Sequence, residues 1–177
     1  DDLAIPFLRI LSDTSPQIKK RDPLYIEGAE SGMIYNTLTK EIYDGEAGVS
    51  VIPCAYQRQY IEWTDSKDGT SSQVLVAMKS TQRKKSKRWN SLMLGLKLKG
   101  ANGLFTPPSY SHVYTLKTIA ESNNLGEWFG WDITRVGPVE DVDTYHAAKA
   151  FADSVAKGEI KVKHEDESVD NGEKAPY

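Results

Sequence analysis

The residues of this chain with the clearest chemical potential are positively charged and lie in one segment. Between Gly69 and Ala120 the sequence has no aspartate or glutamate, although the whole chain carries a net charge of -3. The basic residues of this segment are Lys79, Arg83, Lys84, Lys85, Lys87, Arg88, Lys97, Lys99 and Lys117. A long stretch of one sign on an acidic protein favours a polyanionic partner, of which nucleic acid is the commonest. The alternative is a lysine-rich face that contacts only solvent.

Five of these cations, over residues 83–88, are expected in the first half of one helix, which Ser80 or Thr81 caps and which continues to about Lys97. The side that packs would carry Lys85, Trp89, Leu92, Met93 and Leu96, and the outer side Arg83, Lys84, Lys87 and Arg88. Cations in the first half of a helix oppose its macrodipole by roughly 0.3 to 1 kcal/mol each. Bound phosphate explains their placement, since phosphates are held by Lys, Arg and hydroxyl groups. Acids from elsewhere in the fold could instead neutralise the cluster.

Aromatic side chains near the basic segment indicate stacking of unpaired bases, which contributes about 1 to 3 kcal/mol per base. Tyr56, Arg58 and Tyr60 alternate on one face of an expected strand. Trp128 points outward if Phe129 faces the core, as its pattern predicts. For each ring, packing in the core is the alternative role. The predicted nucleic-acid-binding residues are therefore Arg58, Lys79, Arg83, Lys84, Lys85, Lys87, Arg88, Tyr56, Tyr60 and Trp128.

The elements that must position these residues form a β-rich α+β pattern. They are a hairpin over 33–43, a long strand over 49–63 bent near Pro53, a strand over 73–78, the basic helix, a loop over 100–109, a hairpin over 110–135, and a helix that begins at Asp141 or Asp143 and ends near Gly158. Three strands, a helix and two strands make an OB-fold, a five-stranded barrel that commonly binds single-stranded oligonucleotides.

The sequence thus predicts one OB-like nucleic-acid-binding domain over residues 1–160, an OB-fold-like five-stranded barrel with N-terminal strand additions, one helix between strands and a C-terminal helix. A generic α+β domain is the alternative. Residues 161–177 contain five acids and predict an acidic flexible C-terminal tail. That tail could occupy the basic surface when nucleic acid is absent, recruit partner proteins, or only keep the chain in solution.

The sequence offers little for catalysis, and we predict no enzyme, cofactor or metal. It lacks phosphate-loop, nucleophile-elbow, dinucleotide and Cys/His metal motifs. The run Glu159-Ile160-Lys161, with Asp141 or Asp153 upstream, gives a weak nuclease alternative. The single cysteine, Cys54, cannot form an internal disulfide, and no apolar run approaches the roughly 20 residues of a membrane span. These features predict a cytosolic protein.

Several segments resemble a family of phage-encoded proteins of modest size. They are residues 5–11, 15–17, 25–30 and 32–36, then 80–82, 84–86, 89–90 and 126–128 with Trp131. The family is similar to phage replication proteins that bind single-stranded DNA, including T7-type OB-fold proteins with acidic tails. The sequence differs from those proteins in lacking a strongly acidic final run that ends in phenylalanine, which weakens the expectation that the tail contacts a polymerase.

The resemblance implies a single-stranded DNA-binding protein that acts in phage DNA replication or recombination, without sequence specificity, in the cytoplasm of the infected bacterial host. Its implied partners are single-stranded DNA and replication proteins that the acidic tail would contact, and self-association stays open. The alternative from another class is a virion or host-interaction module with a basic protein-binding surface.

Overall fold

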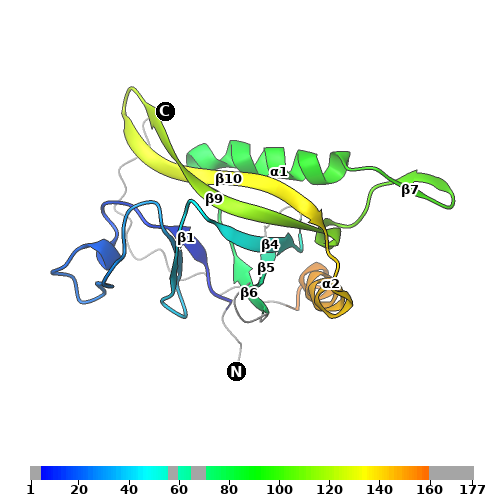
Figure 1. Ribbon diagram of the computed structural model, residues 1–177, viewed down its shortest axis with the longest axis horizontal. Coiled ribbons are helices and arrows are strands. Elements are labelled where there is room, and N and C mark those ends of the chain that lie inside the picture. Colours follow the sequence, from blue (N-terminus) through cyan, green and yellow to red (C-terminus); the bar gives the residue numbers. More distant parts are fainter. Residues whose placement is uncertain (1–4, 56–59, 65–70, 160–177) are drawn as a thin grey trace.

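An open five-stranded antiparallel sheet lies at the centre of the protein (Figure 1). The computed structural model describes residues 5–55, 60–64 and 71–159, and for 60–64 it describes the backbone. The strands of this sheet are β4 (Val49–Pro53), β5 (Tyr60–Thr64), β6 (Ser71–Leu75), β9 (His112–Asn123) and β10 (Gly126–Pro138), in the spatial order β10-β9-β4-β5-β6. The predicted β-rich α+β class is therefore confirmed.

The prediction was an OB-fold-like five-stranded barrel, and the described residues do not form a closed barrel, because β6 and β10 are the two edges of the sheet and do not pair. The prediction of one long strand over 49–63 is also wrong. This segment forms two antiparallel strands, with Val51 of β4 opposite Trp63 of β5. Both halves are rich in β-branched and aromatic residues, so composition does not separate them. Proline cannot donate a ladder hydrogen bond, and β4 ends at Pro53.

A smaller sheet near the N-terminus has the order β1-β2-β3. Its strands are β1 (Leu8–Ile10), β2 (Ile34–Asn36) and β3 (Ile42–Tyr43). The predicted hairpin over 33–43 is confirmed, and its turn places Lys40 at φ +63°. The buried Asn36 side chain accepts hydrogen bonds of 3.0 Å from the backbone N–H groups of Leu38 and Thr39. A side chain therefore holds a turn that lacks the usual Asn-Gly or Asp-Gly pair.

Within the described residues two α-helices accompany the main sheet, and both were predicted. A 3₁₀ turn (Ser80–Gln82) leads into α1 (Arg83–Gly95), and neither Ser80 nor Thr81 caps the helix. Ser80 is instead in the left-handed region, at φ +52°. Helix α2 (Val142–Ala156) begins as predicted at Asp141, whose side chain accepts a hydrogen bond of 2.9 Å from the backbone N–H of Thr144.

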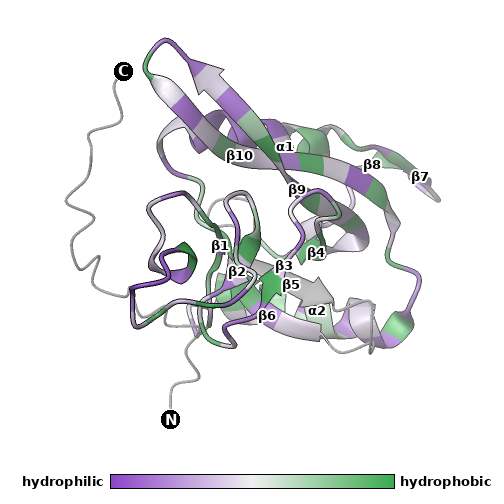
Figure 2. Ribbon diagram, turned by 60° about the vertical axis from the view of Figure 1, so that its left-hand side comes forward, coloured by the Kyte–Doolittle hydropathy of each residue, from purple (hydrophilic) through white to green (hydrophobic). Residues whose placement is uncertain are grey.

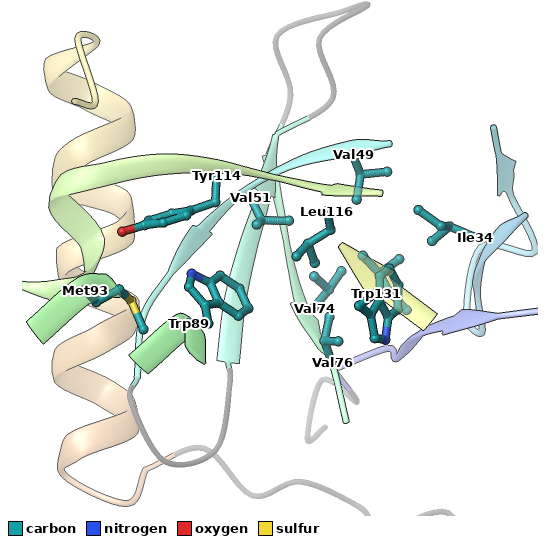
Figure 3. Close-up of a cluster of buried hydrophobic side chains, with 11 residues drawn as sticks. Ile34, Val49, Val51, Val74, Val76, Trp89, Met93, Tyr114, Leu116 and Trp131 are labelled. Atoms are coloured by element: carbon teal, nitrogen blue, oxygen red, sulfur yellow. The ribbon is translucent and has the colours of Figure 1, made fainter. Parts of the chain in front are cut away.

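The main sheet is covered on both faces. On one face Val49, Val51 and Val74 pack with Trp89 and Met93 of α1, and with Leu8 and Ile34 of the smaller sheet (Figure 3). The rings of Trp89 and Tyr114 meet edge to face, with centroids 5.6 Å apart. On the other face Ile52 and Cys54 pack against Ala148, Phe151 and Ala152 of α2. Alternation along β4 therefore sends neighbouring residues to different helices.

The segment that was predicted as a loop over 100–109 contains part of a two-stranded ribbon. Strands β7 (Leu98–Gly100) and β8 (Gly103–Phe105) pair antiparallel after the end of α1, which stops two residues before the predicted Lys97. The ribbon projects away from the rest of the molecule, beyond the C-terminal end of α1 (Figure 1). None of the helices in the described residues is long and apolar enough to cross a membrane.

Candidate nucleic-acid interface

Helix α1 separates its side chains into a packed side and a charged side, as its sequence predicts. Trp89 and Met93 are buried, and Lys85, Leu92 and Leu96 are partly buried. The exposed cations are Arg83, Lys84, Lys87 and Arg88. Within the described residues, no carboxylate lies within 4.0 Å of any of these four side chains. The first turn of the helix also has no acidic residue. The outer face of α1 is therefore a cationic surface without a counter-charge from the described chain.

The fifth cation of the helix, Lys85, has a different environment. Its ammonium forms an ion pair of 2.7 Å with Glu121 of β9, and both side chains are 22% exposed. The predicted alternative, neutralisation by an acid distant in sequence, thus applies to Lys85. Glu121 is the first residue after the acid-free segment, so the segment itself contains no acid that could pair with Lys85. Lys85 is held inside the fold, whereas the other four cations face solvent.

Glu121 joins three elements through its two carboxylate oxygens. One oxygen pairs with Lys85, and the other accepts hydrogen bonds of 3.2 Å from the Gln82 amide and 2.8 Å from the Trp128 indole. Trp128 lies directly opposite Glu121 in the β9–β10 register. Gly130 gives the carboxylate space, because a Cβ at that position would lie 2.2 Å from its oxygen. We call Gln82, Lys85, Glu121 and Trp128 the Glu121 network.

The network also provides hydrogen-bond partners for backbone groups at the free edge of the main sheet. The backbone N–H of Trp131 in β10 donates to the Gln82 side-chain oxygen at 2.9 Å, and the Trp131 carbonyl accepts from Lys85 at 3.0 Å. Unpaired groups on an edge strand favour unwanted pairing with other chains. Gln82 and Lys85 therefore both protect this edge and fix the N-terminal end of α1 against it, with the charged side of the helix outward.

The ionisation state of the Glu121 carboxyl group follows from these contacts. Partial burial acts to raise the pKa of Glu121, but hydrogen bonds from Lys85, Gln82 and Trp128 outweigh it, so the pKa lies below its ordinary value of 4.5. The carboxylate is consequently ionised at neutral pH. Neither Glu121 nor the contact of Gln82 with it was predicted from the sequence. One signal was present: helical spacing placed Lys85 on the packed side, where a lysine needs a partner.

The other predicted site residues are placed as follows. Trp128 is partly exposed, and its indole N–H is used by Glu121. Phe129, which was predicted to face the core, is 38% exposed and lies against Gly32. Lys79 is exposed and directly precedes the 3₁₀ turn. Tyr56, Arg58 and the side chain of Tyr60 lie outside what the structure describes, so their predicted roles stay predictions, as does the tail over 161–177.

Acidic residues near α1 are few. Asp132 of β10 lines a shallow hollow together with Lys85, Arg88, Trp89, Leu92 and Ile133. Its carboxylate is farther than ion-pair distance from both cations. In the nuclease alternative, Asp141 precedes α2 and Glu159 follows it. A helix of this length separates its ends by about 22 Å, so these two acids do not share one metal site. In the described ranges, no group of three or more His, Cys, Asp or Glu side chains is arranged so that it could hold a metal ion.

Comparison with known proteins places the sequence in a phage family. The sequence matches the model of a family described as Pam3 phage gp34-like protein, in two overlapping segments, residues 1–72 and 65–161. Searches of curated proteins and of solved structures gave no match. The matched segments together span most of the chain and contain the smaller sheet, the main sheet and both helices. The chain therefore belongs to the Pam3 phage gp34-like protein family.

Proposed function

We propose that this protein binds single-stranded DNA, without sequence specificity, in phage DNA replication or recombination. The observation that carries the proposal is the outer face of α1, where Arg83, Lys84, Lys87 and Arg88 are exposed with no carboxylate partner among the described residues. These side chains would bind phosphates. A ligand with its own negative charge explains why cations occupy a helix end at which the macrodipole disfavours them.

The position of Trp128 supports a single strand rather than a duplex as the ligand. The Glu121 network links this ring to the N-terminal end of α1, and the ring is partly exposed. Base stacking needs an aromatic face near a groove of positive charge. Because the indole N–H already donates to Glu121, the orientation of the ring is fixed before a base arrives. A preorganised ring loses less entropy on binding.

The strand order supports an OB-like interpretation of the main sheet. Strands β4, β5 and β6 form a meander, and β9 returns after α1 to lie beside β4. Three consecutive strands with a fourth beside the first make a Greek key. The OB-fold is a partly open Greek-key barrel of five strands. In this proposal β10 is the fifth strand, and α1 lies at its free edge.

Fluorescence anisotropy with labelled oligo-dT over a range of salt concentrations tests the proposal. The variant Lys84→Gln/Lys87→Gln/Arg88→Gln removes three expected phosphate contacts. Since log affinity for a single strand falls by about 0.7 per contact with log salt, its salt dependence should be less steep by about 2. The matched control replaces Lys19, Lys20 and Arg21 with glutamine as well. These three cations of the N-terminal region are exposed, and the net charge changes by the same amount.

The proposal fails if the triple variant of α1 binds oligo-dT no more weakly than the control variant does, or if the wild type does not bind it. Tryptophan fluorescence gives a second measurement, because, of the tryptophans whose side chains the structure describes, Trp89 and Trp131 are buried and Trp128 is not. Stacking predicts saturable quenching that Trp128→Phe diminishes. A basic surface that meets an acidic protein, as in a virion or host-interaction module, predicts no quenching by oligo-dT.

A further inference from the structure

The β7–β8 ribbon exposes apolar side chains that a soluble protein normally buries. Leu104 is 74% exposed, Phe105 47% and Leu98 37%. The ribbon has three residues per strand, and isolated two-stranded ribbons of this kind are only marginally stable in water. At its base the Lys97 ammonium donates to the carbonyl of Leu94 and to the Thr106 hydroxyl, which ties its two strands to the end of α1. An exposed apolar ribbon that the fold holds in place indicates a binding function.

The register gives the ribbon two distinct faces. Leu98 and Phe105 are directly opposite each other and share one face, whereas Lys99 and Leu104 share the other. The Phe105 ring lies over Gly100, where a Cβ would be 3.1 Å from ring carbons. One side of the ring therefore rests on the ribbon backbone, and much of the remainder is open to solvent. This arrangement suits the stacking of a planar group on the ring.

Charge decides which partner fits. The ribbon lies within the segment that has no acidic residue, and its cation Lys99 has no ion pair in the part of the chain that is described. A symmetric contact of two ribbons through the face that carries Leu104 would place Lys99 of both copies in one interface. An anionic partner avoids that repulsion. In Figure 2 the ribbon continues the line of α1, so a ligand on the basic face of the helix can reach it.

We infer that the ribbon is an arm that extends the single-stranded nucleic-acid site beyond α1, with Phe105 stacking on a base, Leu104 packing against a neighbouring base and Lys99 contacting a phosphate. This inference rests on the proposed function and adds a second contact region to it. Apolar and aromatic side chains beside lysines are the groups that nucleic-acid-binding arms insert between bases. The helix and the ribbon together would span about 30 Å.

The test measures the affinity of the full chain for oligo-dT of about 16 nucleotides, the upper end of the site size of one OB-fold. Loss of one stack should lower the affinity of Phe105→Ala by about 5- to 150-fold. Leu104→Ala should lower it in the same direction. The matched control is Leu38→Ala, which removes a leucine that is 61% exposed in the N-terminal hairpin. Lys99→Gln should flatten the salt dependence by about 0.7.

The outcomes separate this inference from the proposed function. If Phe105→Ala and Leu104→Ala bind as Leu38→Ala does, while the triple variant of α1 binds weakly, the ribbon inference is overturned and the proposed function stands. If the wild type does not bind oligo-dT, both fall. If sedimentation without DNA shows a dimer that Leu104→Ala dissociates, a second copy occupies the ribbon and the inference is wrong.

Discussion

Replacing Glu121 tests whether its network holds α1 in place. Its carboxylate accepts from three donors, of which Lys85 is charged and only 22% exposed. Glu121→Ala leaves all three without that partner. Breaking a fully buried pair costs about 3 to 5 kcal/mol, and water reaches this one in part, so we expect a loss of about 3 kcal/mol in the free energy of unfolding. Glu121→Gln keeps the shape and one acceptor oxygen, and should cost about 2 kcal/mol.

The stability difference between the wild type and Glu121→Gln should depend on pH. The folded-state pKa of Glu121 lies below 4.5, because the hydrogen bonds it accepts outweigh the effect of its burial. A carboxyl group with a depressed folded pKa stabilises the protein fully above its ordinary pKa, and this contribution is lost as the pH falls through the folded value. The difference in stability between the wild type and Glu121→Gln should therefore be largest near neutral pH and should narrow below about pH 4.5.

Guanidinium unfolding followed by circular dichroism, from about pH 7 to about pH 3, measures both effects. Glu127→Gln is the matched control, because Glu127 is exposed on the same hairpin and its replacement should change stability by less than about 0.5 kcal/mol. Equal stabilities of the wild type and Glu121→Ala at neutral pH would refute the argument. So would a gap between the wild type and Glu121→Gln that stays constant in acid.

Three further predictions use the same unfolding assay. Gly45→Ala should destabilise the protein by about 1 to 3 kcal/mol, since its Cβ would lie 2.0 Å from the Gly32 carbonyl oxygen, and a stability equal to that of the wild type would contradict this contact. Trp89→Phe should change stability by less than about 1 kcal/mol, because the buried indole N–H has no hydrogen-bond partner among the described residues, whereas Trp89→Ala should cost about 3 to 5 kcal/mol. Lys84→Met should preserve or slightly raise stability but weaken oligo-dT binding, whereas Lys85→Met should lower stability. Equal effects of the two substitutions on stability would contradict the division of α1 into two sides.

The parts of the fold that the sequence predicts are those with local causes. Both helices follow from apolar spacing, and Asp141 follows from the preference of aspartate for the position before a helix. The strand prediction failed between Val49 and Trp63, where strand propensity does not change across the position at which one strand ends. The ribbon was missed because each of its strands has only three residues, and the Asn102-Gly103 pair, which also favours hairpin turns, was interpreted as part of a loop.

The site was harder to predict than the fold because its contacts join distant parts of the chain. The outer cations of α1 follow from helical spacing alone. Glu121 becomes the partner of Lys85 only through the register of β9 with β10 and the packing of α1 at the free edge of β10. Such a contact depends on tertiary placement, which local patterns do not contain. A lysine on the packed side of a helix was nevertheless a sign that a distant acid would be needed.

The network also explains how an acidic protein can keep a concentrated positive surface. Within the described residues, one carboxylate pairs with one of the five cations of α1, and that pair joins the helix to the sheet. An acid within ion-pair distance of the outer cations would neutralise that face, but the first turn has none and Asp132 is farther than that from Arg88. Because Gln82 and Lys85 bind the Trp131 backbone, rotation of the helix would break both contacts. The same interactions that stabilise the edge strand therefore direct the remaining cations towards solvent, where a phosphate backbone could reach them.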